Sequence, residues 1–191
     1  MERTGRIERI RLICLLRKAP WARGGGARAG GDSKGTGLSC PYRVCAGVCG
    51  ERIVSVSLPF FVYGTLRPGE PNHDHFLRGR TTAEEPALLQ GAALYDGPGY
   101  PYAVEEPGIV RGDLVTARPE EYGALLVALD RLEEYAPGDP RNLYERVERE
   151  VVREADGTPV RAWAYVAAPA VAEGLRRHGS RIATGDWLAL R

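Results

Sequence analysis

Short apolar runs separated by glycine and proline fill the chain from residue 58 onward. The first, LPFFVY (58–63), is rich in β-branched and aromatic residues and ends at Gly64. It is followed by ALLQGAALYD (87–96), YPYAV (100–104) and VRGDLVTA (110–117), each of strand length with turn residues between them. Such runs are typical of β-strands, so we expect a strand in each of the four.

Residues 143–168, LYERVEREVVREADGTPVRAWAYVAA, show the pattern of a long β-hairpin. Val147 and Val151 alternate with charged residues, and the alternation resumes after Asp156-Gly157. Asp-Gly is a preferred dipeptide for hairpin turns. We therefore expect two antiparallel strands with the turn at this dipeptide.

One segment, RPEEYGALLVALDRLEEY (118–135), predicts a helix. Pro119 suits the first helical position, and Glu120 and Glu121 suit the positive end of the helix dipole. Its apolar residues recur at the spacing of one buried helix face: Tyr122, Leu125, Leu126, Leu129 and Leu132. Many strands with one or two helices favour an α+β domain, in which a curled sheet or small barrel has helices packed outside it.

An acid, Glu133, lies on the apolar stripe of this predicted helix. At about 100° per residue, Glu133 falls between Tyr122 and Leu126. A carboxylate facing the core loses hydration, which raises its pKa and suits it to general acid and base catalysis near neutral pH. The alternative is that Glu133 bends out to water or pairs with an arginine such as Arg146.

A Gly-Thr-Leu turn follows the first predicted strand. Because Gly64 has no side chain, the successive N–H groups of Gly64, Thr65 and Leu66 could bind an anion or a carboxylate. An ordinary connection between a strand and a loop would have the same sequence. A turn of exposed amides and a core-facing acid in one small domain favour a shared site.

Residues 1–57 differ in composition from the rest of the chain. They hold eleven Lys or Arg against four acids, a net charge of +7, together with all four cysteines. They are rich in Gly and Arg and show no sustained helical or strand periodicity of apolar residues. We therefore expect a disordered basic tail before a domain of residues 58–191. The favoured interpretation is that this tail has no function, or that the true start lies near Val54 or Val56. The run LICLL is too short for a signal peptide or a membrane span.

Three functional interpretations of the tail stay open. Cys40, Cys45 and Cys49 could bind a metal, although a zinc site needs four ligands at closer spacing. The Arg-rich, acid-poor composition also fits an organellar transit peptide. The positive charge could bind nucleic acid, but no aromatic residues are interleaved for stacking. Our expectation is a cytoplasmic protein without nucleic-acid or membrane partners.

Residues 58–191 contain fifteen Arg, no Lys, no Cys and twenty-one acids, a net charge of −6. A thiolate nucleophile and a Schiff-base lysine are therefore excluded from this domain. His73 and His75 could share a metal, but two ligands do not make a site, and a solvated loop is the alternative. DGPGYPY (96–102) lacks the third glycine of a dinucleotide-binding loop. We expect no metal and no cofactor.

The order of several motifs resembles the gamma-glutamylcyclotransferase superfamily, within it the branch of gamma-glutamylamine cyclotransferase and AIG2-like proteins. The motifs are FFVYGTLRPGEPNH (60–73), LYDGPGYPYAV (94–104), VRGDLV (110–115), LDRLEEY (129–135), LYERVEREVV (143–152) and TGDWL (184–188). They run through essentially all of residues 58–191 and leave residues 1–57 unmatched.

The resemblance implies a small mixed β-barrel flanked by helices and a reaction without a cofactor. In that reaction the α-amino group of a γ-glutamyl substrate attacks its own γ-carbonyl, which gives 5-oxoproline and a free amine or amino acid. The family's catalytic glutamate falls on Glu133. The family's substrate-binding turn falls on Tyr63, Gly64, Thr65 and Leu66, and Tyr144 matches a tyrosine that lines the family's pocket.

The leading hypothesis is thus a γ-glutamyl cyclotransferase with Glu133 as general acid and base. Glu134 departs from the glycine that many members have after the catalytic glutamate. A second hypothesis is a non-catalytic module that senses a γ-glutamyl-like metabolite or contacts a partner. A third is hydrolysis or transfer of an amide in the same pocket. The leaving amine and the oligomeric state stay open.

Overall fold

A computed structural model describes residues 57–190 of the chain. The predicted basic tail covers residues 1–57, and all of it except Ser57 lies outside the described residues. Five strands form a closed ring in the order β3-β1-β5-β4-β2, because β2 and β3 also pair with each other, and β6 extends the sheet from β2. The strands are β1 (Phe60–Val62), β2 (Thr81–Asp96), β3 (Pro101–Ala117), β4 (Tyr144–Arg153), β5 (Pro159–Ala167) and β6 (Ser180–Arg181).

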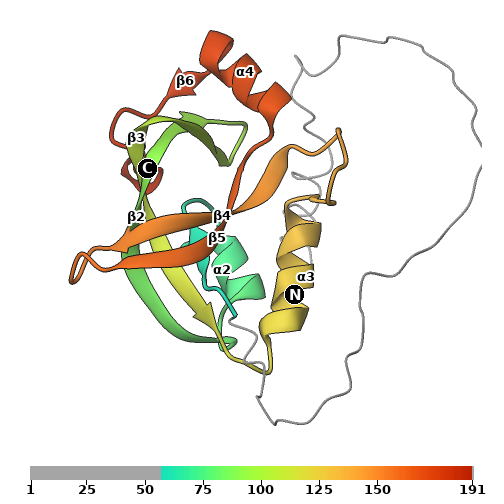
Figure 1. The fold of residues 1–191 in the computed structure, drawn as a ribbon, viewed down its shortest axis with the longest axis vertical. Helices are drawn as coiled ribbons and strands as arrows, with labels where there is room; N and C mark the ends of the chain where they lie inside the picture. Colours follow the sequence, from blue (N-terminus) through green and yellow to red (C-terminus); the bar gives the residue numbers. More distant parts are fainter. Residues whose placement is uncertain (1–56, 191) are drawn as a thin grey trace, which may run out of the picture.

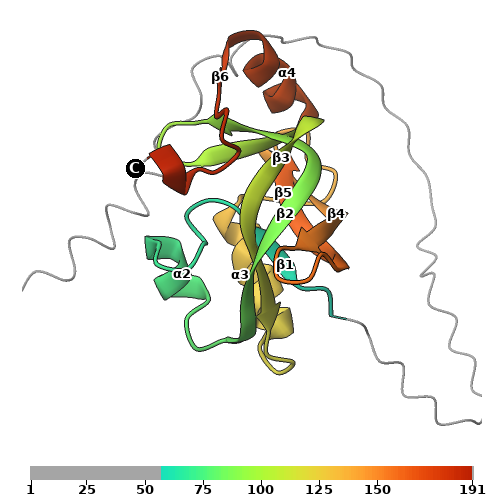
Figure 2. The same ribbon diagram turned by 90° about the vertical axis from the view of Figure 1, so that its left-hand side faces the viewer.

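The ring is a mixed barrel, as the sequence predicted. β1 runs parallel to β5, whereas the β1–β3, β2–β3, β2–β4 and β4–β5 pairs are antiparallel. Figures 1 and 2 show the barrel from two perpendicular directions, with helix α4 (Pro169–His178) at one end in both views.

β2 and β3 are longer than predicted. Residues 100–104 and 110–117 were expected as separate strands, but β3 runs through Pro107 and Gly108 without a break. The pairing register shifts between Gln90 and Ala92, where Gly91 has φ of 72°. Between the pairs Gln90–Ile109 and Ala92–Glu105, β2 has one residue and β3 has three, so β3 bulges while the pairing continues on both sides. The local turn signal was therefore overridden by pairing with β2.

The predicted hairpin is confirmed. β4 and β5 pair from Tyr144 opposite Ala167 to Val152 opposite Pro159. The turn includes Gly157, whose φ of 72° is a left-handed conformation that glycine adopts without steric cost.

Three α-helices flank the barrel: α2 (Pro71–Phe76), α3 (Tyr122–Leu132) and α4 (Pro169–His178), with a 3-10 turn at Leu188–Leu190. α3 is the predicted helix, but Pro119 is not its first residue. Glu121 is the N-cap, and residues 119–121 form a turn before it. Neither α2 nor α4 was predicted individually. No helix within residues 57–190 is long and apolar enough to cross a membrane.

The apolar core forms two clusters on opposite faces of β1. Phe60 belongs to the cluster that includes Leu125 and Leu129 of α3. Phe61, the next residue, belongs to the cluster that includes Trp187 near the carboxyl terminus. Successive side chains of a strand point to opposite faces, so β1 is covered on both sides. The end of β1 and the end of α3 are thereby fixed relative to each other.

Candidate active site

A pocket of about 240 Å³ opens where β1 and α3 end. Its walls come from β1 and the turn after it, the start of α2, the β2–β3 turn, the end of α3, and the first residues of the β4–β5 hairpin. The structure brings together at its walls all six residues that the sequence singled out: Tyr63, Gly64, Thr65, Leu66, Glu133 and Tyr144.

Glu133 is the C-cap residue of α3, directly after its last helical residue. Its N–H still donates to the carbonyl of Leu129, at 3.0 Å. The N–H groups of Glu134 and Tyr135 then donate back to the carbonyls of Arg131 and Asp130, at 3.4 Å and 2.8 Å. These two bonds are the Schellman pattern that closes many helices, and it requires a left-handed residue after the cap.

Glu134 is that left-handed residue, with φ of 52°. Within residues 57–190 it is the only residue other than glycine with positive φ. Many members of the superfamily that the sequence resembles have glycine at this position. Its side chain is exposed and lines the pocket beside Glu133.

The carboxyl group of Glu133 has little electrostatic compensation. Burial raises the pKa of Glu133 from 4.5 to about 7. The expected alternative partner, Arg146, instead donates to Asp130 at 2.7 Å. Within residues 57–190 no side chain donates a hydrogen bond to Glu133, so desolvation is not offset and the group titrates near neutral pH.

The tyrosines around Glu133 stay protonated at neutral pH. Burial, followed by the charge of Glu133, raises the pKa of Tyr63 above its ordinary value of 10.0. Burial, then the charges of Tyr63 and Glu133, raises the pKa of Tyr144 in the same direction. Of these three groups, Glu133 is therefore the one whose protonation changes near pH 7.

The turn after β1 lines the pocket and contains backbone amides without a protein acceptor. The N–H of Arg67 closes the turn by donating to the carbonyl of Gly64 at 3.0 Å. In the part of the chain that the structure describes, the N–H groups of Gly64, Thr65 and Leu66 donate to no protein acceptor. A Cβ at position 64 would lie 2.9 Å from Pro101 Cδ, so the glycine is required by packing against the β2–β3 turn.

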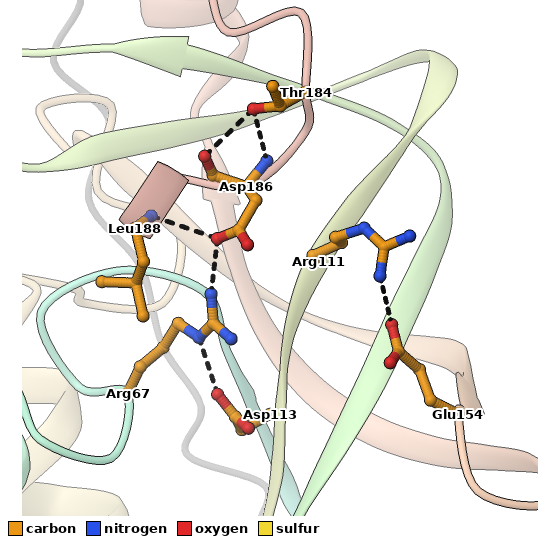
Figure 3. A network of polar contacts seen from close by, with 7 residues as sticks. All are labelled: Arg67, Arg111, Asp113, Glu154, Thr184, Asp186 and Leu188. Carbon is orange, nitrogen blue, oxygen red and sulfur yellow. Dashed lines mark hydrogen bonds and ion pairs between the residues drawn. The ribbon is translucent and has the colours of Figure 1, made fainter. Parts of the chain in front are cut away.

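Arg67 fixes the far side of this turn, and sequence reasoning missed it. Its Nε donates to Asp113 Oδ2 and its Nη1 to Asp186 Oδ1, both at 2.7 Å (Figure 3). Asp113 is buried in β3, and Asp186 also accepts from the N–H of Leu188 at 3.1 Å. We call these three charged residues the Arg67 clamp. It ties the turn to β3 and to the carboxyl-terminal segment.

A chain of hydrogen bonds connects the turn to the end of α3. The hydroxyl of Tyr63 donates to the carbonyl of Tyr165 at 2.6 Å. The hydroxyl of Tyr165 donates to Asp130 Oδ1 at 2.7 Å, and Arg146 holds the other oxygen of Asp130. Asp130 lies one helical turn before Glu133. These bonds hold the amide turn and the acid at a fixed separation, while the Tyr63 hydroxyl is already occupied by protein.

Tyr144 shapes the pocket through its ring. Its hydroxyl donates to the carbonyl of Pro101 at 2.9 Å, and its ring stacks on Tyr102 with centroids 4.9 Å apart. The lining therefore offers an apolar wall at this point.

The charges around the pocket are all negative. Its lining includes Glu70, Glu133 and Glu134 and no Lys, Arg or His. An anionic group that enters the pocket must therefore be held by N–H and O–H donors of the lining.

His73 and His75 do not lie in a solvated loop. Both are in α2, and His73 is 8% exposed, with Nε2 3.0 Å from Glu84 Oε1. Within residues 57–190 no group of three or more His, Cys, Asp or Glu side chains is arranged to hold a metal ion. The loop interpretation was wrong because a tertiary contact with β2 buries His73.

Comparisons with known proteins identify the family of the chain. The family model described as "Gamma-glutamyl cyclotransferase, AIG2-like" matches residues 60–189. The gamma-L-glutamyl-butirosin B gamma-glutamyl cyclotransferase of Niallia circulans is 40% identical over 107 residues. The match covers 56% of this chain and 64% of that protein, so the chain spans less than two thirds of its relative's length.

Solved structures are similar as well. An AIG2-like protein from Mus musculus has 25% identity and a TM-score of 0.46, over 59% of this chain and 80% of its own. An Arabidopsis thaliana protein has 30% identity and a TM-score of 0.48, over 68% of each chain. With the family model covering nearly the whole described domain, the chain belongs to the AIG2-like gamma-glutamyl cyclotransferase family.

Proposed function

We propose that the chain is a cofactor-free γ-glutamyl cyclotransferase in which Glu133 is the general acid and base. The observation that carries this proposal is an uncompensated carboxyl group with a pKa of about 7 in the same pocket as three unpaired turn amides. A base with this pKa is ionised in a large fraction of molecules at neutral pH and still gives up its proton readily.

The reaction needs only groups that the pocket contains. Ionised Glu133 takes a proton from the α-ammonium of the substrate, and the freed amine attacks the γ-carbonyl carbon. A carbon–nitrogen bond forms to the α-nitrogen, and the bond from the γ-carbon to the leaving nitrogen breaks. Glu133 returns its proton to that nitrogen. The α-nitrogen loses two protons overall, and the leaving amine departs as an ammonium ion that carries both.

The nucleophile and the electrophile belong to one molecule, so most of the catalytic advantage comes from geometry. Holding a folded substrate in a near-attack arrangement is worth effective molarities on the order of 10⁵ to 10⁸ M in favourable systems. A positioned base adds about 10² to 10⁴-fold. We therefore assign Tyr144 and Tyr63 to the walls that fold the substrate, and the amides of residues 64–66 to its negative end.

The leaving group is open within the class of amines and amino acids. The relative from Niallia circulans acts, by its name, on γ-L-glutamyl-butirosin B. Glu70 and Glu134 line the pocket of this chain, and carboxylates favour amines that carry further positive charge. A substrate panel should therefore include γ-glutamyl polyamines and aminoglycosides beside γ-glutamyl amino acids.

The test is product analysis by mass spectrometry with the full chain and its Glu133→Gln variant. The parent should release 5-oxoproline, and the variant should be at least about 10²-fold slower. Since the base must be ionised, kcat/KM of the parent should fall as the pH drops below about 7. Binding of γ-glutamyl compounds without 5-oxoproline from either protein would refute catalysis and favour the binding module.

A further inference from the structure

The short helix after the turn holds two buried polar side chains that the proposed reaction does not use. Asn72 and His73 are each 8% exposed, although α2 has only six residues. Asn72 lines the pocket, whereas His73 points to β2. Buried polar groups are usually kept where they make specific hydrogen bonds, so both require an explanation.

His73 fixes the position of the helix. Its Nε2 lies 3.0 Å from both carboxylate oxygens of Glu84. The hydroxyl of Thr81 donates to Glu84 Oε1 at 2.7 Å. Burial acts to raise the pKa of Glu84, but the hydrogen bonds from Thr81 and His73 outweigh it and the pKa is lowered. Glu84 is therefore an ionised acceptor, and Nε2–H of His73 donates to it.

Asn72 makes its own bond in the opposite direction, toward the turn. Its Nδ2 donates to Thr65 Oγ1 at 2.9 Å. An amide nitrogen can only donate, so the hydroxyl oxygen of Thr65 is the acceptor. The hydroxyl has one proton of its own, which must point away from Asn72. Within residues 57–190 it meets no protein acceptor, and Thr65 lines the pocket.

The Thr65 hydroxyl therefore joins the turn amides as a fourth donor. Because no cationic side chain lines the pocket, a fixed negative charge there must be bound by N–H and O–H donors, and these four lie together on one turn. Every γ-glutamyl substrate has such a charge on its glutamyl part, the α-carboxylate. Hydrogen bonds to a carboxylate are stronger than bonds between neutral groups, which makes the direction of a single proton matter.

We propose that Asn72 is a positioning residue that directs the hydroxyl proton of Thr65 to the α-carboxylate of the substrate. The assignment rests on the proposed function for the identity of the ligand. It also gives the NHDH segment (72–75) a role: His73 holds α2 against β2, and this fixed position lets Asn72 orient Thr65.

The test measures binding by calorimetry, without turnover. Two probes are compared: 5-oxo-L-proline, which carries the carboxylate, and 2-pyrrolidinone, which is the same ring without it. Asn72→Asp keeps the shape of the side chain but makes it an acceptor that takes the Thr65 proton. The affinity of the full chain for 5-oxo-L-proline should fall at least tenfold, and that for 2-pyrrolidinone should change less than twofold.

Thr65 supplies the controls. Thr65→Ser retains the hydroxyl and should bind 5-oxo-L-proline like the parent, whereas Thr65→Val should lose about as much as Asn72→Asp. The double variant should lose no more than either single variant, because Asn72 acts through Thr65. If the new charge at position 72 merely repelled the ligand, the losses would add.

Additive losses, equal losses for both probes, or a parent that binds the two probes equally would each overturn the proposal. The proposed function fails separately. A chain that shows this binding pattern but releases no 5-oxoproline would refute catalysis and leave the role of Asn72 intact.

Discussion

Replacing Glu133 with glutamine should stabilise the folded chain at high pH and not at low pH. The folded state raises the pKa of Glu133 from 4.5 to about 7 because burial disfavours the charge. Below pH 4.5 the carboxyl is protonated in both the folded and the unfolded chain, so it carries no penalty. Between 4.5 and 7 the folded chain binds more protons, so its free energy of unfolding falls as the pH rises.

The size of the effect follows from the two pKa values. Each pKa unit corresponds to about 1.4 kcal/mol, so the difference between 4.5 and about 7 gives a penalty of about 3 kcal/mol above pH 7. Glutamine has nearly the same shape and no charge, so it removes this penalty. The variant should therefore gain up to about 3 kcal/mol at pH 8.5 relative to the parent, and close to nothing at pH 4.5.

Urea denaturation at the two pH values measures this difference directly. Glu134→Gln is the matched control, since it removes the charge of an exposed neighbour. A gain for Glu133→Gln that is the same at both pH values would show that the carboxyl titrates normally. That result would remove the physical basis for treating Glu133 as a base near neutral pH.

Three further substitutions and one control probe how the site is held. Glu134→Gly should stabilise the fold by about 1 kcal/mol in urea denaturation, because glycine adopts the φ of 52° without steric cost, and a loss would contradict this. Arg67→Met should destabilise by about 3 kcal/mol and raise KM, since it leaves two aspartates unpaired. The control for Arg67→Met is Arg111→Met, on the strand that carries Asp113. It breaks the exposed ion pair with Glu154 and should cost less than about 1 kcal/mol (Figure 3). If the two variants changed stability and KM equally, the Arg67 clamp would have no special role. Tyr165→Phe removes the hydrogen bond to Asp130, so it should lower the free energy of unfolding by about 2 kcal/mol and lower kcat by loosening the end of α3. An unchanged kcat would show that this hydrogen bond does not contribute to catalysis.

The parts of the fold that the sequence predicted are those with local signals. Glu133 could be located by helical spacing although α3 ends at Leu132, because the cap residue still donates into the last helical turn. The β4–β5 hairpin was readable from alternation and the Asp156-Gly157 dipeptide. In each case the residues that decide the structure lie within a few positions of one another.

The parts that were missed depend on distant contacts. Gly64 was singled out from the sequence, but its close packing against Pro101 was not, and Arg67 pairs with acids at positions 113 and 186. His73 is buried by Glu84, so a six-residue helix without an apolar period becomes part of the core. Spacing along the chain carries no information on which segments meet across a barrel.

The central claim, intramolecular attack, is tested most directly by turnover in water enriched in oxygen-18. Cyclisation uses no water, so the account predicts unlabelled 5-oxoproline in a one-to-one ratio with the released amine. Glutamate that carries oxygen-18 in its γ-carboxyl group would mean that water is the nucleophile, and it would contradict the account.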